Sequence, residues 1–346
     1  MSFIFADPVC GYTTVADSAK RGWNVSGNTL AAGRFGLQAF RMTNSANWLF
    51  KAFPATAGRI IVQFSIKFDA HISASKFFRI WNNSGAEICL ELGVSAADAL
   101  QVYNAAGTLV ATTAGGLLAP DRWNTIAVEA QIGSSTGTVK VWVNQPSSGA
   151  TPIVNLAGID LTDTSGAGAD TVDWMLQSVG GAPFWNLSEV LIYDTSGPAP
   201  MNAYLGDKRL HVLLPNGAGS ATAWTQFPAS TSNFDKVDDP ITAAPDADAT
   251  YNGATTGAGA DLYAFGDLPA GTTGIVGVVE EAELRKTDAG VISPQLRMRA
   301  NATNLDSAAI SPFETYTKHQ HFSADVPGGT GWTEANVNGM EAGQVI

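Results

Sequence analysis

The chain has 346 residues. One hydrophobic core usually stops growing at roughly 250–300 residues, so two domains are expected. The formal net charge is −12, from 31 acidic and 19 basic side chains, and a field of that sign disfavours binding to nucleic acids and to anionic membranes. Glycine (36) and proline (16) are frequent and only 14% of residues are charged, a composition typical of proteins built from many short strands and turns.

Further classes of protein are excluded by local features. The apolar runs at 60–62 and 274–279 are far too short to span a bilayer, so membrane insertion is not expected. Residues 1–8 lack the basic and apolar regions of a secretory signal. Cys10 and Cys89 are too few for a disulfide scaffold and have no zinc-site spacing, so both are expected to be reduced thiols.

Apolar and polar residues alternate in short segments between residues 58 and 194, the pattern of strands with one buried face. In 59–68, for example, Val62 and Phe64 fall on one side and Gln63 and Ser65 on the other, which predicts a half-exposed strand. Hairpin turns are predicted at 82–85 and 133–137, and even spacing of strands predicts a sandwich or jelly roll. The expected strands are 59–68, 76–81, 87–94, 100–103, 108–112, 123–132, 138–144, 173–178 and 184–194.

The proline-punctuated stretch 195–200 is the best candidate for a domain boundary. We predict a first domain at 1–197 and a smaller β-rich domain, for assembly or anchoring, at 198–346. Thr333 is expected to cap one short helix that ends before Gly343. The second domain is expected to have strands at 210–214, 260–265, 274–286, 291–300 and 316–322, a hairpin turn at 287–290 and a long loop or arm at 235–259.

Two resemblances rest on local motifs. The first is to the laminin-G/concanavalin A-like jelly roll, through the runs 77–82, 123–128 and 186–194. The second is to virion proteins of tailed bacteriophages that carry such a jelly roll near the N-terminus. Its motifs are Phe5-Ala6-Asp7 to Tyr12, Arg34-Phe35-Gly36 with Arg41, 205–209 leading to 214–217, 261–265 followed by 285–290, and 331–334 followed by 341–343.

These resemblances imply an all-β protein: an N-terminal concanavalin/laminin-G-like jelly-roll sandwich plus a second, smaller β-domain with a short C-terminal helix. They imply a structural protein on the exterior of a virion, in first place a tail-tip or fibre component for host attachment or glycan binding. The expected partners are the chain itself, as a homotrimer, other virion proteins and a host surface glycan, with assembly in the host cytoplasm. A capsid decoration protein or head fibre is the alternative, and a glycan-degrading enzyme on the same fold is a remote one.

No catalytic residues are assigned, and the chain is expected not to be an enzyme. Concanavalin-like glycosidases place two glutamates on one strand around a central aspartate, whereas Glu87 and Glu91 flank Cys89. Positions four apart on a regular strand are separated by about 13 Å, and a retaining glycosidase needs about 5–5.5 Å between carboxyl groups.

Binding candidates are few. Trp142, Trp174 and Trp185 are the glycan-binding candidates, with Trp81 considered beside them, because an apolar indole face complements a pyranose ring. Trp142 stands out since its strand places valines on the opposite face.

Metal candidates form two groups. Asp160, Asp163 and Asp170 lie in a Gly/Ser/Thr-rich stretch whose oxygens would suit calcium, with Asp173 following them. His319 and His321 share one side of a strand, a spacing used by some metal sites. Neither group matches a defined motif, so no cofactor is expected and calcium is kept as the alternative.

Overall fold

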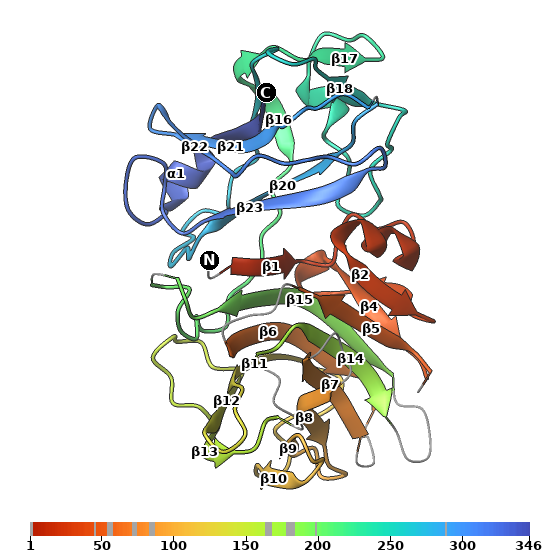
Figure 1. Cartoon of the computed structure of the whole chain (residues 1–346), viewed down its shortest axis with the longest axis vertical. Coiled ribbons are helices and arrows are strands. Elements are labelled where there is room, and N and C mark those ends of the chain that lie inside the picture. Colours follow the sequence, from red (N-terminus) through yellow and green to blue (C-terminus); the bar gives the residue numbers. More distant parts are fainter. Residues whose placement is uncertain are drawn as a thin grey trace. The chain divides into compact units, whose positions relative to one another are not determined.

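The computed structural model describes residues 3–44, 46–53, 58–70, 75–82, 87–162, 168–177, 184–197, 199–287 and 289–346. The chain divides into two compact units, Met1–Leu210 and His211–Ile346 (Figure 1). Residues 198–210, which the sequence analysis placed in the second domain, are therefore part of the first unit. Strands dominate both units, which confirms the prediction of an all-β protein.

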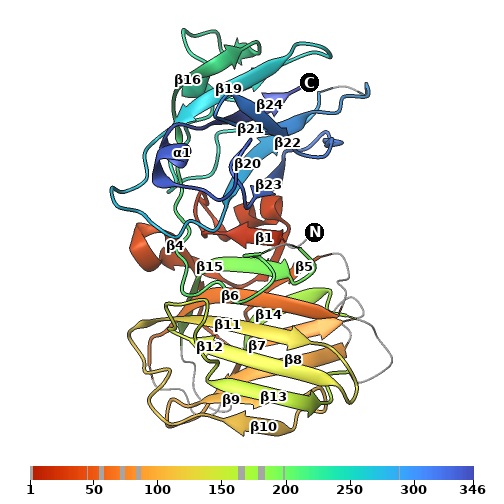
Figure 2. The same cartoon turned by 90° about the vertical axis from the view of Figure 1, so that its left-hand side faces the viewer.

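The first unit contains two antiparallel sheets. One has eight strands in the order β13-β12-β11-β6-β15-β4-β3, and β1 pairs with β15 beyond β4. Its strands are β1 (Phe3–Asp7), β3 (Thr29–Ala32), β4 (Gln38–Met42), β6 (Arg59–Phe68), β11 (Trp123–Gln131), β12 (Gly137–Val143), β13 (Val154–Ile159) and β15 (Trp185–Asp194). In Figure 2, β12, β11, β6 and β15 run across the front of this unit.

The other sheet has seven strands in the order β10-β9-β8-β7-β14-β5-β2. They are β2 (Trp23–Ser26), β5 (Trp48–Ala52), β7 (Ser75–Asn82), β8 (Glu87–Val94), β9 (Leu100–Tyr103), β10 (Leu109–Thr112) and β14 (Thr171–Gln177). Short 3-10 helices flank the strands at η1 (Val15–Arg21) and η2 (Arg34–Gly36). The two sheets form the expected concanavalin/laminin-G-like sandwich.

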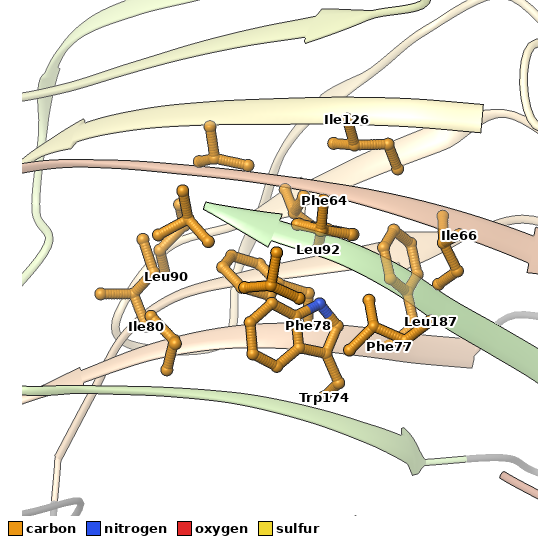
Figure 3. Close-up of a cluster of buried hydrophobic side chains, with 14 of the residues drawn as sticks. Phe64, Ile66, Phe77, Phe78, Ile80, Leu90, Leu92, Ile126, Trp174 and Leu187 are labelled. Atoms are coloured by element: carbon orange, nitrogen blue, oxygen red, sulfur yellow. The ribbon is translucent and has the colours of Figure 1, made fainter. Parts of the chain in front are cut away.

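The core lies between these sheets, where the alternating apolar residues of each strand meet (Figure 3). Phe64 of β6, Phe78 of β7 and Trp174 of β14 form its centre, with ring centroids 5.0 Å (Phe64–Phe78), 5.4 Å (Phe64–Trp174) and 5.3 Å (Phe78–Trp174) apart. All three side chains are fully buried. Truncating such an aromatic side chain to alanine typically costs about 3–5 kcal/mol of stability.

Residues 199–210, here called the covering segment, pack on the outer face of the eight-stranded sheet. The Tyr204 ring stacks on Trp142 of β12 at 4.5 Å, and its hydroxyl donates to the Gln145 carbonyl at 2.6 Å. Ile61 and Gln63, on the outer side of β6, are 0% and 3% exposed. The expectation that β6 is half exposed is therefore wrong, because the covering segment and its neighbours bury the outer face too.

The second unit contains a five-stranded sheet in the order β16-β19-β24-β21-β22 and two separate pairs, β17-β18 and β20-β23. Its elements are β16 (Pro215–Thr222), β17 (Thr225–Phe227), η4 (Phe234–Lys236), β18 (Tyr251–Gly253), β19 (Ala260–Phe265), β20 (Val278–Leu284), β21 (Gln295–Ala300), β22 (Thr303–Asp306), β23 (Thr317–Ser323), α1 (Glu334–Asn338) and β24 (Glu341–Val345). A core cluster smaller than that of the first unit includes Met298, Trp332 and Met340.

Three expectations for this unit can be compared with its structure. Thr333 caps α1, since its hydroxyl accepts a hydrogen bond from the Asn336 amide at 3.2 Å, as predicted. The helix ends earlier than expected, at Asn338, because the chain enters β24, which contains Gly343. Residues 210–214 are not a strand. The predicted hairpin between 274–286 and 291–300 is wrong, because β20 pairs with β23 and β21 pairs with β22 and β24. Asp288, in the expected turn, lies outside the described residues.

In the described part of the chain, no helix has the length and apolar character needed to cross a membrane.

Candidate functional site

The outer face of the seven-stranded sheet carries one row of polar and aromatic side chains across five strands. Register places Tyr103 of β9 opposite Glu91 of β8, Glu91 opposite Arg79 of β7, Arg79 opposite Asp173 of β14, and Asp173 opposite Phe50 of β5. Their sequence neighbours point into the core, so these five side chains point outward. We call these five, together with Trp48 and Trp81, which lie two positions from Phe50 and Arg79 on the same strands, the charged–aromatic row.

The centre of the row is a network of ion pairs. Glu91 accepts hydrogen bonds from Lys76 Nζ at 2.6 Å and from Arg79 Nε at 2.8 Å, so a donor engages each of its carboxylate oxygens. Burial raises the pKa of Asp173 to about 6, although Arg79 and a hydrogen bond from Trp81 act in the opposite direction. Asp173 therefore holds a proton in a weakly acidic range where ordinary aspartates are ionised.

Aromatic rings flank this charged centre. On β5, Trp48 and Phe50 stack with ring centroids 5.1 Å apart at an interplanar angle of 19°. At the other end, the Tyr103 ring lies against Gly93, where an added Cβ would come within 3.1 Å of Tyr103 Cε2. Trp48, Phe50, Trp81 and Tyr103 are all partly exposed. The face therefore offers flat apolar surfaces next to fixed charged groups.

The tryptophans singled out from the sequence lie elsewhere. Trp174 and Trp185 are 0% exposed and belong to the core between the sheets, so neither presents a ring face to solvent. Trp142 points to the outer face of the eight-stranded sheet, as its strand pattern predicts, but Tyr204 covers it and only 5% of it is exposed. Trp81 is the tryptophan of that group that lies partly exposed in the row.

The candidate calcium ligands do not come together at one point in the described structure. Asp160 follows β13, and its carboxylate accepts a hydrogen bond from the Thr162 amide at 3.1 Å, which closes a local turn. Asp163 lies outside the described residues. Asp170 immediately precedes β14, whereas Asp173 lies within that strand and belongs to the charged–aromatic row.

His319 and His321 lie on one face of β23, as their spacing predicts. His321 is opposite Glu280 of β20, an acidic neighbour that sequence order does not reveal, and His319 Nε2 lies 3.0 Å from the Thr317 hydroxyl. Burial lowers the pKa of both histidines. Among the described residues, no three His, Cys, Asp or Glu side chains are grouped so that they could hold a metal ion.

A β-bulge separates Glu87 from Glu91, the two glutamates that the sequence analysis compared with a glycosidase pair. Register puts Leu90 opposite Ile80 but Ile88 opposite Trp81, so Cys89 is the extra residue. Because the bulge reverses the alternation, Glu87 and Glu91 lie on opposite faces of β8. The two carboxyl groups therefore do not flank a common groove.

Sequence reasoning missed most of the row. Trp48 and Phe50 belong to β5, a five-residue strand for which no alternating pattern was recognised. Arg79 and Trp81 alternate with buried residues of β7, and that alternation is the signal that could have marked them as outward-facing.

No family model matches the chain, and no curated protein matches its sequence. Among solved structures, a sialidase matches with a TM-score of 0.42 and 8% identity, over 56% of this chain but only 19% of its own length. The catalytic domain of a glycoside hydrolase family 131 protein from Coprinopsis cinerea gives a TM-score of 0.38 and 16% identity, over 60% of this chain and 99% of that domain. The binding domain of botulinum neurotoxin DC, in complex with rat synaptotagmin II, gives a TM-score of 0.40 and 8% identity, over 82% of this chain and 68% of that domain. Because these scores are low, the fold assignment rests on the sheets themselves.

Proposed function

We propose that the chain is a non-enzymatic structural protein of the exterior of a tailed-bacteriophage virion, and that it binds a host surface saccharide through the charged–aromatic row. The row carries the binding part of this proposal. Its partly exposed rings suit the apolar face of a pyranose, and Glu91 and Arg79, which are 2% and 8% exposed, are already held in place by their ion pair. Groups that are already fixed lose little side-chain entropy when a ligand binds.

The virion part of the proposal is supported by the sequence resemblance and by the net charge of −12, which suits a component that does not touch packaged DNA. A tail-tip or fibre position is our first choice, and a capsid decoration protein or head fibre is the alternative. We assign self-assembly, as a homotrimer, to the second unit, because its core cluster is small for a stretch of this length. Other virion proteins are the remaining partners.

The absence of catalysis is proposed on the geometry of the carboxylates. Glu87 and Glu91 lie on opposite faces of their strand, and Glu91 is held by two cations. Asp173 and Glu91 lie on the two strands that flank Arg79. Neighbouring strands are about 4.8 Å apart, so the backbones of these two residues are separated by two such spacings. Arg79 occupies the position between them where an attacking water would have to stand.

Glycan binding can be tested with the full chain on a glycan array and by calorimetry with the saccharide found. We expect Trp81→Ala to weaken binding about tenfold, corresponding to about 1.4 kcal/mol. Phe313→Ala is the matched control, because it removes an aromatic ring that is 64% exposed in the second unit. Binding that is absent from the array, or equally weakened by Trp81→Ala and by the control, contradicts the proposal.

The virion position and the lack of catalysis need separate measurements. A reconstruction of assembled particles should place the chain on the tail or the capsid, and particles that lack it would refute a structural role. Incubation with the bound glycan should release no shorter product. Hydrolysis that disappears in Asp173→Asn would establish the enzymatic alternative instead.

A further inference from the structure

A pocket of about 560 Å³ opens on the outer face of the eight-stranded sheet. Its floor is a second cross-strand row: Trp123 of β11 lies opposite Lys67 of β6, Lys67 opposite Asn186 of β15, and Asn186 opposite Arg41 of β4. Asp69 follows directly after β6 and completes the polar lining. The volume lies in the range of about 300–1,000 Å³ that is usual for small-molecule sites.

Asp69 is the best-positioned acceptor in this pocket. Arg41 Nη2 donates to its Oδ2 at 2.8 Å, and Asn186 Nδ2 donates to its Oδ1 at 2.9 Å. Each oxygen thus holds one donor and keeps a further lone pair, so the carboxylate can accept two hydroxyl groups from a ligand. Its orientation is fixed before any ligand arrives.

Asn186 is the second polar group that fixes Asp69 in the pocket. The residue is only 5% exposed, lines the pocket, and its Oδ1 has no hydrogen-bond partner among the described residues. A buried polar atom without a partner costs about 1–3 kcal/mol, and the core atoms Trp174 Nε1 and Trp185 Nε1 are in the same situation. The contribution of Asn186 to the pocket is therefore the hydrogen bond that it donates to Asp69.

The charges of the pocket balance. Arg41 is paired with Asp69, and Lys67 Nζ lies 3.9 Å from Asp121 Oδ1 at the rim. A site with two cations and two anions has no net charge with which to select a charged ligand. Trp123 is partly exposed at one side and provides an apolar face.

We propose that this pocket binds a neutral saccharide with two neighbouring hydroxyl groups. The two hydroxyls donate to Asp69, a ring or hydroxyl oxygen accepts from Lys67, and the apolar face of the sugar packs on Trp123. The site belongs to the eight-stranded sheet and is separate from the charged–aromatic row on the other sheet, so it does not depend on the function proposed for that row.

Saturation-transfer NMR on the full chain tests this assignment, with the methyl glycosides of glucose, galactose and mannose as neutral probes and N-acetylneuraminate as the acidic probe. At least one neutral probe should give a signal that falls at least tenfold in Trp123→Ala and in Asp69→Ala. The same signal should be unchanged in Trp81→Ala, which alters only the charged–aromatic row. Trp123→Phe should retain it, because the substitution keeps an aromatic face.

Three results would overturn the proposal: no signal from any neutral probe, a neutral signal that persists when Trp123→Ala is combined with Trp81→Ala, or a signal from N-acetylneuraminate alone that the pocket variants abolish. Thermal unfolding of each variant shows whether it is folded. If Trp123→Ala and Asp69→Ala both unfold, the neutral-probe signal is compared between the wild type, Trp123→Phe and Trp81→Ala. A signal retained in both variants supports the pocket. A signal lost in Trp81→Ala comes from the charged–aromatic row and refutes the pocket.

Discussion

Glu280 of β20 should make the second unit less stable as the pH rises from 7 to 8. Its side chain is 7% exposed and lies opposite His321 in the strand pair. Burial raises its pKa from 4.5 to about 8, although the nearby backbone amides of Gly343 and Arg297 oppose the rise. Tyr263 of β19 and Asp306 of β22 are the other titratable groups around it.

The sign follows from proton binding. Between pH 4.5 and 8 the folded state keeps the proton of Glu280 and the unfolded state releases it, so stability falls as the pH rises and levels off above 8. With these two pKa values the loss between pH 7 and pH 8 is about 1 kcal/mol, at 1.36 kcal/mol per pKa unit. His319 and His321, whose pKa values burial lowers, titrate below this window.

Hydrogen exchange of the full chain, read in peptides from β20 and β23, measures this change. After correction for the intrinsic pH dependence of exchange, protection should fall roughly fivefold from pH 7 to pH 8, the equivalent of about 1 kcal/mol. Glu280→Gln should remove this dependence. Glu281→Gln is the matched control, because Glu281 is paired with Lys318 Nζ at 3.0 Å, and it should keep the dependence. Equal protection at both pH values, or the same loss in Glu280→Gln, would refute the reasoning.

Two further predictions concern the first unit, and urea unfolding of the full chain measures both. Asp7→Asn should cost about 3–5 kcal/mol, because the fully buried carboxylate accepts from Arg21 Nη1 at 3.1 Å and the change leaves that guanidinium without its counter-ion. A loss below about 1 kcal/mol would mean that the pair is not needed for folding. Tyr204→Ala should cost about 3 kcal/mol, since it removes the ring stacked on Trp142 and the hydrogen bond to Gln145, and it should raise the exposure of Trp142 to fluorescence quenchers. An unchanged quenching constant would show that the covering segment does not shield that ring.

The long strands of the first unit could be predicted because apolar and polar residues alternate along their sequence with the period of a strand. The bounds expected for 59–68 and 87–94 match β6 and β8. The four-residue β9 matches the expected 100–103 because a turn signal at 105–107 marks its end. In contrast, β1 to β5 have only four or five residues each, too few for alternation to stand out. The pairing of β20 with β23 joins segments more than thirty positions apart, and no local pattern encodes such a partner.

The covering segment shows a different limit of sequence reasoning. Its proline-punctuated start has the composition of a linker, and its packing depends on single contacts such as Asp207 with Arg34, joined by two hydrogen bonds of 3.1 Å each. The alternation of β12 correctly places Trp142 on the outer face, but it carries no information about Tyr204, which lies some sixty positions further on. The same reason explains why the partly exposed Trp81, rather than Trp142, lies in the candidate site.

The two outer faces of the sandwich differ in the side chains that are left to contact a ligand. On the eight-stranded sheet, Ser65, Thr125 and Glu189 are engaged by Arg34, and Asp207 accepts a further hydrogen bond from Thr125 at 2.8 Å. These polar groups already form hydrogen bonds that hold the covering segment, so they are not available to bind sugars. What remains on that sheet is the pocket beside Asp69, whereas the seven-stranded sheet keeps a row of partly exposed rings. Loss of the Arg34 contacts should therefore lower stability without changing the affinity of either proposed site, while Trp81 and Trp123 should each affect one site only.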